Sequence, residues 1–368
     1  MVDKQIMTQR IKEITQIMGV GGHEFQVANY IARQLKDHVD SLEMRPNGML
    51  IARKKGTKPG KKVAVCAHMD EVGYIIKSIT PEGFLYFDKI GEPTDAVMPG
   101  RKVLVEGRPG EYIPGIIGVR AGHLLTAEEM AKPQTVGQSY VDLCVHSRQE
   151  VEEMGIRVGT QMVLDSPCTH MYNPDFMSTR ACDCRVPCAI LMETMKNLKA
   201  EDIHGEIYAC FTVLEESTVA GGAVVSNYVQ PDYGIFLDTV PCGDVPDCDA
   251  VKELPLALEK GAALILSQQW AAAAMFAGSH PKLCDAIRAS AKATGAKLQE
   301  FAFNSAAYVT DAVGAVNSGN GMAVVTLALP RRFSHSPVET FHIQDVLDHQ
   351  AILEDVLKQD VDLNMLNF

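Results

Sequence analysis

The chain has 368 residues, of which 46% are hydrophobic and 22% charged, and its formal net charge is −12. This length and composition predict a folded protein with a sizeable core and exclude a largely disordered chain. The acidic balance, without a cluster of Lys and Arg, argues against nucleic acid as a partner.

The first nineteen residues predict an amphipathic helix and not a secretion signal. Ile6, Ile11, Ile14 and Met18 fall on one helical face, and charged residues interrupt them. No apolar run in the chain approaches the roughly 20 residues that a membrane span requires. We therefore expect no membrane partner and a cytoplasmic location, where the ten cysteines would stay as thiols. Disulfides are the less favoured alternative.

Residues 1–73 read as the opening of an α/β domain, and residues 74–164 differ from them. After a glycine turn at 19–22, apolar residues recur every four positions from Val27 to Leu35, as on a helix, and an apolar strand precedes His68. From 74 to 164, short β-rich runs are separated by Gly and Pro. We interpret this second segment as an inserted small β-barrel-like domain.

From residue 165 to residue 368 strands and helices alternate again. Apolar runs and helical patterns follow one another at 207–214, 234–237, 281–294, 322–329 and 343–357. Near-continuous apolar strands separated by helices predict an α/β fold with a mostly parallel sheet flanked by helices. Residues 1–73 and 165–368 would then form one catalytic domain around the insertion.

Ligand-type side chains follow the predicted strands at their carboxyl ends. His68 follows the first strand, Glu215 and Glu216 the second, Asp238 the third, and a loop containing His335 the fourth. In open α/β sheets ligands bind at this edge, so these segments should converge on one crevice. Two histidines and several carboxylates suit zinc, cobalt or manganese and not a structural zinc held by four cysteines. The pattern therefore predicts a metal site.

Two more carboxylates complete the predicted site. A dinuclear centre needs a bridging carboxylate, for which Asp183 is the best candidate. Asp70 stands two residues after His68 and can accept the other ring proton of that histidine. Each of these sequence features also has a simpler explanation, because a histidine at a strand end is often structural and adjacent glutamates usually lie in a solvated turn. Their joint occurrence after successive apolar runs favours the metal site.

Several sequence strings resemble the glutamyl and tetrahedral aminopeptidase family of dinuclear metallopeptidases. They occur in the family's order across nearly the whole chain: AHMDEVG at 67–73, NP at 173–174, RACDCR at 180–185, FTVLEE at 211–216, GDVP at 243–246, TDA at 310–312 and HSPVE at 335–339. The resemblance implies a metal-dependent aminopeptidase that removes N-terminal residues from peptides by means of a water activated by two metals.

The resemblance also implies a role for each site residue. It places two divalent ions in each subunit, with zinc expected and cobalt or manganese as alternatives. One ion would be held by His68, Asp183 and Asp238, and the other by Asp183, Glu216 and His335. Asp183 would bridge the ions, Glu215 would be the catalytic base, and Asp70 would orient His68.

The family further implies an inserted β domain after the first motif, and self-association of dimers into a dodecamer that admits peptides. Two other functions stay open at this point. Some relatives have carried an endoglucanase label, so a glycoside hydrolase is one alternative. An amide deacylase or a non-peptidase member is the other.

Some positions depart from the family pattern, although no expected metal ligand is lost. Cys184 stands where the family has a second Asp, Pro187 stands where Gly is usual, and residues 217–220 replace a Val-Gly-Leu-Arg loop. The altered loop leaves substrate preference open. The group of Cys182, Cys184 and Cys188 could be a thiolate metal site or a redox switch, but small packed thiols are the favoured interpretation. His123 is expected to be a packing or interface residue.

Overall fold

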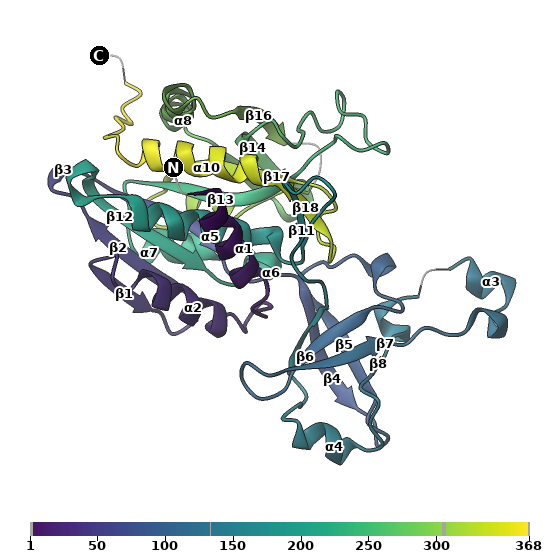
Figure 1. Cartoon of the computed structure of the whole chain (residues 1–368). Helices are drawn as coiled ribbons and strands as arrows, with labels where there is room; N and C mark the ends of the chain where they lie inside the picture. The colour runs from purple at the N-terminus through teal and green to yellow at the C-terminus, as the bar shows by residue number, and fades with distance from the viewer. Residues whose placement is uncertain (1–2, 133, 304–306, 367–368) are drawn as a thin grey trace.

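The computed structural model describes residues 3–132, 134–303 and 307–366. Figure 1 shows a large sheet with its helices and, beside it, a smaller group of strands in blue. The large sheet has nine strands, and β16 pairs with β14 outside the main path β1-β2-β12-β3-β13-β17-β14-β15. The strands are β1 (Ser41–Met44), β2 (Leu50–Lys55), β3 (Lys58–His68), β12 (His204–Thr212), β13 (Tyr233–Pro241), β14 (Ala262–Trp270), β15 (Met275–Gly278), β16 (Leu298–Phe303) and β17 (Ala323–Arg331).

The sheet is mixed, which corrects the expectation of a mostly parallel one. The central strands β12, β3, β13 and β17 are parallel to one another, and β16 is parallel to β14. The pairs β1–β2, β2–β12, β14–β17 and β14–β15 are antiparallel. Short turns join β1 to β2 and β14 to β15, and such turns can connect only antiparallel neighbours. The sequence patterns identified the four central parallel strands and missed β1, β2, β14, β15 and β16.

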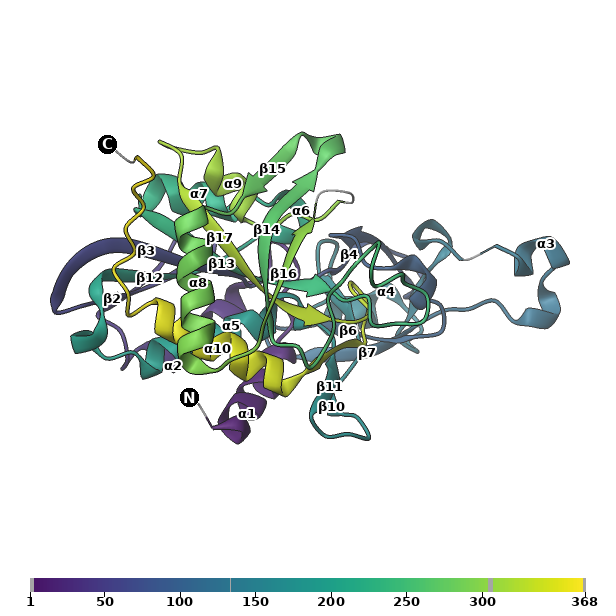
Figure 2. The ribbon, with the colours of Figure 1, turned by 90° about the horizontal axis from the view of Figure 1, so that it is seen from above.

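Two groups of helices flank the sheet. In the first group α5 (Cys182–Asn197) packs on β3 and β13 and also contacts α1 (Lys4–Thr15), α2 (Phe25–Leu35) and α10 (Ile343–Val356), and α8 (Pro281–Thr294) packs on α10. In the second group α7 (Gly221–Tyr228) packs against α9 (Ala312–Val316), β12 and β3. Figure 2 shows α8 and α10 crossing each other over the sheet. No helix among the described residues is long and apolar enough to span a membrane.

A wholly buried arginine joins the N-terminal helix to the edge of the sheet. The Arg185 guanidinium donates to the carbonyl oxygens of Ile14 (3.2 Å), Ile17 (2.8 Å) and Gly19 (3.0 Å). It also donates to the carbonyl of Met69 and lies 3.3 Å from Glu71 Oε1. A buried guanidinium needs an acceptor for each of its N–H groups, because an N–H group without one loses its hydrogen bond to water and gains nothing in return.

The smaller group of strands forms a closed barrel with its own core. The barrel order is β4-β5-β8-β7-β6-β9. Its strands are β4 (Gly73–Ile79), β5 (Leu85–Ile90), β6 (Lys102–Glu106), β7 (Tyr112–Ile117), β8 (Val141–Asp142) and β9 (Gln161–Leu164). Tyr74 and Phe87 meet edge to face inside it, with ring centroids 5.2 Å apart. The barrel thus has a hydrophobic centre separate from that of the large sheet.

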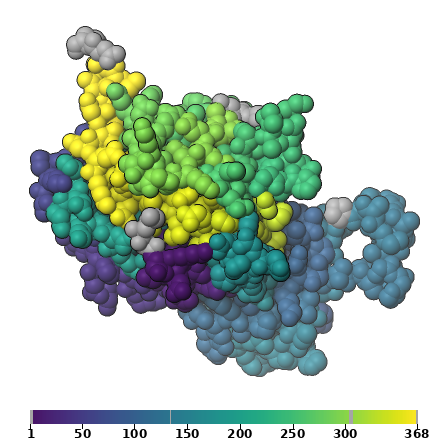
Figure 3. All heavy atoms as spheres, turned by 45° about the horizontal axis from the view of Figure 1, so that its top comes forward, coloured from purple at the N-terminus to yellow at the C-terminus, as the bar shows by residue number. Residues whose placement is uncertain are grey.

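An arm extends from the barrel between β7 and β8. It carries the short helix α3 (Ala127–Met130) and projects away from the rest of the molecule in Figures 2 and 3. Val119, Leu124 and Met130 on this arm are 60–63% exposed. The remaining elements are α4 (Arg148–Glu153), α6 (Glu215–Thr218) and a small sheet of β10 (Thr169–His170), β11 (Phe176–Thr179) and β18 (Glu339–His342).

Candidate metal centre

The parallel strands β3, β12 and β13 bring predicted site residues to one edge of the sheet. His68 is the last residue of β3 and pairs with Thr212, the last residue of β12. Asp238 lies near the end of β13, which neighbours β3. His68 is 3% exposed and Asp238 7%. Because the strands are apolar on both faces, these polar groups are held in a largely water-free environment.

Asp183 lies between the two predicted histidines. Its Oδ1 is 3.1 Å from His68 Nε2, and its Oδ2 is 3.6 Å from His335 Nε2. It stands at the start of α5, where Asp183 and Cys184 have non-helical dihedral angles. The regular helix therefore begins after them, so Pro187 falls in its first turn, a position that proline tolerates.

The structure gathers the five predicted ligands into two groups that share Asp183. His68, Asp183, Asp238 and also Cys184 offer ligand atoms that all lie within 4.8 Å of one another; we call this group the deep cluster. Asp183, Glu216 and His335 meet the same limit and form the outer cluster. The sequence analysis anticipated the members of both groups except Cys184.

Asp70 and Glu215 lie beside these clusters. The Asp70 carboxylate is 3.4 Å from His68 Nδ1, and it accepts hydrogen bonds from the backbone N–H groups of Glu215 (3.1 Å) and Glu216 (3.0 Å). Glu215 Oε2 is 3.8 Å from His68 Nε2. Leu214 just before them has a positive φ of 61°, so a sharp turn after β12 presents both glutamates to the site. Asp70 thus holds the turn through its carboxylate and the His68 ring mainly through its backbone carbonyl oxygen, which lies 3.1 Å from Nδ1.

Burial and crowded charge shift the pKa values of the clustered carboxylates. Burial raises the pKa of Asp238 to about 8, and Asp183 reinforces the shift. Burial likewise raises the pKa of Glu216 to about 8, with His335 opposing and Asp183 reinforcing the change. Burial would also raise the pKa of Asp183, but Arg331, His335 and His68 together outweigh it and hold that pKa well below its usual range. The shared carboxylate is therefore the one held in its ionised form.

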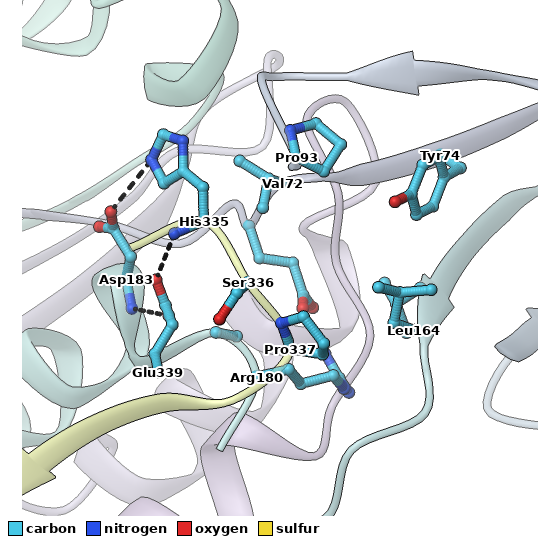
Figure 4. A pocket seen from close by; sticks show the side chains of 13 residues that line it. Val72, Tyr74, Pro93, Leu164, Arg180, Asp183, His335, Ser336, Pro337 and Glu339 are labelled. Atoms are coloured by element: carbon cyan, nitrogen blue, oxygen red, sulfur yellow. Dashed lines mark hydrogen bonds and ion pairs between the residues drawn. The ribbon is translucent and has the colours of Figure 1, made fainter. Parts of the chain in front are cut away.

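Two residues that the sequence reasoning missed support the shared carboxylate. The Arg331 guanidinium pairs with Asp183 Oδ2 and lies 3.3 Å from Glu339 Oε1. Glu339 in turn accepts from the backbone N–H groups of Asp183 (3.1 Å) and His335 (3.0 Å), as Figure 4 shows. Glu339 belonged to the string that resembles the family, which was a usable signal. No sequence pattern pointed to Arg331.

A cavity of about 620 Å³ opens beside the outer cluster. Glu215, Glu216 and His335 line it, together with the apolar side chains of Trp270 and Met275 from the β14–β15 edge. Ser217, Thr218 and Val219 also line it, so the loop that departs from the family pattern does border this space. The candidate base and the metal-ligand groups therefore face one chamber large enough for part of a peptide.

The remaining histidine and cysteine predictions concern residues outside these clusters. His123 lies in an exposed turn at Gly122–Leu124, on the arm of the barrel. All ten cysteines fall within the described residues, and none forms a disulfide. Cys188 Sγ donates to the backbone oxygen of His68 (3.1 Å), and neither Cys182 nor Cys188 joins a ligand group among the described residues.

Comparison with known proteins agrees with this geometry. The chain is 31% identical over 328 residues to the putative aminopeptidase FrvX of Escherichia coli, covering 89% of this chain and 88% of the relative. The solved structure of an aminopeptidase from Desulfurococcus kamchatkensis superposes with a TM-score of 0.89 at 26% identity, covering 97% and 96% of the two chains. The Pyrococcus horikoshii TET1 peptidase, described as assembling into a tetrahedron or a large octahedral shell, gives 0.82 at 27% identity, with 95% and 98% covered.

The sequence model of the M42 glutamyl aminopeptidase family matches residues 48–352, which is most of the chain. The resemblance noted in the sequence is thereby confirmed. The chain belongs to the M42 glutamyl aminopeptidase family and is a peptidase hydrolase of the aminopeptidase class.

Proposed function

We propose that this aminopeptidase works with two divalent metal ions, one in the deep cluster and one in the outer cluster, to remove N-terminal residues from peptides. The position of Asp183 carries the proposal. Its two carboxylate oxygens reach separate histidines, His68 at 3.1 Å and His335 at 3.6 Å. A carboxylate placed between two nitrogen ligands suits a pair of metal ions such as those of two-metal hydrolases.

The donor groups present fit a pair of such ions. Two imidazoles and three carboxylates converge at the centre, and among the described residues Arg331 and the histidines are the cationic partners of Asp183. Glu216 Oε1 is buried, and within the described part of the chain it has no hydrogen-bond partner. A buried carboxylate oxygen is costly unless a cation or a donor satisfies it. Nitrogen and oxygen donors of this kind favour zinc, and cobalt or manganese would also fit.

The protein's own residues divide the chemistry between them. Two bound ions would supply polarisation of the scissile carbonyl and a lower pKa for the attacking water. Glu215 lies outside both ligand groups and lines the same cavity, so we assign it to take the proton of the attacking water and pass it to the leaving amine. Asp70 is a positioning residue, because it holds the His68 ring and the turn that carries Glu215.

We also propose how the chain is divided and assembled. Residues 1–73 and 165–368 form the catalytic domain, and residues 74–164 form an inserted domain for self-association and substrate access. The closed barrel with its own core supports this division. The projecting arm with exposed Val119, Leu124 and Met130 offers an apolar contact surface for other copies. A dodecamer built from dimers in the cytoplasm is the expected form, and light scattering would give its mass.

Replacing Glu215 by Gln tests the mechanism. The variant should keep both metal ions and lose hydrolysis of aminoacyl-anilides by about 10²- to 10⁴-fold, the usual contribution of a general base. Glu92→Gln is the matched control, because Glu92 lines the same cavity but its side chain is 82% exposed and pairs with Lys89. If Glu215→Gln kept a tenth of the wild-type rate with its metals bound, Glu215 would not be the base.

Metal removal separates this function from the alternatives that the sequence left open. A chelator should abolish aminopeptidase activity, and restored zinc, cobalt or manganese should return it. A glycoside hydrolase needs only two facing carboxyl groups and no obligatory metal. Cellulose hydrolysis that survived complete metal removal would therefore favour that alternative. If the metal-loaded protein hydrolysed none of a panel of aminoacyl-anilides and short peptides, a deacylase or a non-peptidase would be favoured.

A further inference from the structure

The deep cluster contains a donor that neither the family pattern nor the proposed mechanism uses. Cys184 is wholly buried, and its sulfur lies within 4.8 Å of ligand atoms of His68, Asp183 and Asp238. The thiol donates to the backbone oxygen of Leu237 (3.5 Å), the residue just before Asp238 in β13. The sulfur is therefore held at the inner side of the deep cluster, beside the three proposed ligands.

The neighbouring cysteines show what a merely packed thiol looks like here. Cys182 and Cys188 are also buried on α5, and Cys188 Sγ is bonded to the backbone oxygen of His68 at 3.1 Å. Neither is grouped with the ligand atoms among the described residues. Burial alone therefore does not bring a sulfur to the centre. The position directly after Asp183 does, because the backbone there is not yet helical.

We propose that Cys184 is a fourth protein ligand of the deep ion, bound through its sulfur as a thiolate whose proton is released to solvent when the ion binds. This inference rests on the proposed two-metal function. The deep site would then have one imidazole, two carboxylates and one thiolate as donors. Zinc accepts sulfur, nitrogen and oxygen donors of this kind together. A thiolate also selects zinc or cadmium over manganese, because soft sulfur suits these ions better than hard ones.

The metal positions in the deep and outer clusters would consequently have different roles. The outer cluster has three protein donors, Asp183, Glu216 and His335, and all three line the cavity of about 620 Å³, whereas Asp238 and the shared Asp183 are the residues of the deep cluster that border it. Three protein donors with an open position are typical of a catalytic metal site. In this chain the thiolate would make the deep ion the more selective one, and the outer position would face the peptide.

Cobalt(II) spectroscopy of the metal-free full-length protein tests the inference. Reloaded wild-type protein should show the near-ultraviolet charge-transfer absorption that a thiolate gives with cobalt(II). Cys184→Ser should lose that absorption while still binding cobalt at the outer cluster. Cys188→Ser, a buried thiol on the same helix, should keep it. Cys184→Asp, which restores the residue usual in the family, should raise the affinity for manganese relative to zinc by about tenfold or more.

The outcomes separate this inference from the proposed function. Cobalt bound without the sulfur absorption, or with absorption that survives in Cys184→Ser, would overturn the role of Cys184 and leave the two-metal centre standing. Failure of the wild-type protein to bind cobalt or zinc would overturn both. X-ray absorption of zinc-loaded wild-type protein decides the question even if the variants do not fold. We expect a sulfur neighbour at about 2.3 Å, and a shell of only nitrogen and oxygen at about 2.0–2.2 Å would contradict it.

Discussion

The deep and outer clusters share Asp183 but are built differently. In the deep cluster, His68 and Asp238 belong to central strands, and their side chains are almost inaccessible. In the outer cluster, the His335 side chain is 32% exposed and stands on a loop with a φ of 56°. Its ring and backbone are held by the Glu92 carbonyl oxygen (3.2 Å) and by Glu339 (3.0 Å). A strand fixes a ligand by its own hydrogen-bond ladder, whereas a loop ligand depends on individual partners.

The strongest test of the two-cluster arrangement is to remove the carboxylate that the clusters share. Asp183→Asn should bind neither ion tightly and should lose at least about 10³-fold in kcat/KM, because the polarisation supplied by metals is worth several kcal/mol. His335→Gln should lose only the outer ion. Metal analysis beside kinetics checks both expectations. Two ions retained by Asp183→Asn would mean that this residue does not bridge them.

A smaller effect should follow from weakening the support of the outer cluster. Glu339→Gln would loosen the contacts to Asp183, His335 and Arg331 without removing a proposed ligand. Partners of this kind are typically worth about 10- to 100-fold in metal affinity or activity. We expect the outer ion to be affected more than the deep one, which titration with a chelator would measure. Val338→Ala in the same loop is the control. Equal weakening of both ions would remove the distinction between the clusters.

The smallest expected effect concerns the substrate side. Trp270 lines the cavity beside the outer cluster and is 43% exposed. Trp270→Ala should raise KM for substrates with a large apolar N-terminal residue by about fivefold, the equivalent of roughly 1 kcal/mol of lost apolar contact. Metal content and the KM for alanyl substrates should hardly change. An equal rise in KM for all substrates would show that Trp270 does not contact the N-terminal side chain of the substrate.

The same contrast explains what the sequence could predict. His68 ends β3, Asp238 lies near the end of β13 and the Glu215–Glu216 pair follows β12, and the register of these parallel strands brings the residues together. Asp183 and His335 stand at a helix start and in a loop, so their roles depended on the family resemblance. Arg331 lies just beyond the predicted strand at 322–329, and its pairing with Asp183 exists only after distant segments fold together.

The fold shows a similar division between local and long-range information. Helix α8 was predicted at its observed bounds, because Pro281 begins it and Gly295 ends it with a φ of 71°. The antiparallel edge strands were missed, since their direction is set by short turns and not by an apolar pattern. A small β-barrel-like domain was predicted at residues 74–164, but its strand order depends on pairings between distant segments, which local patterns do not reveal.

The bonding of Arg185 sets a limit on how far this chain can be shortened from its N-terminal side. The match to the family begins at residue 48, so a fragment cut there would omit α1 and the carbonyl groups of Ile14, Ile17 and Gly19. Arg185 would keep only Met69 and Glu71 as partners while remaining part of the helix that follows Asp183. Each buried donor left without an acceptor costs about 1–3 kcal/mol. A fragment design should therefore begin before α1.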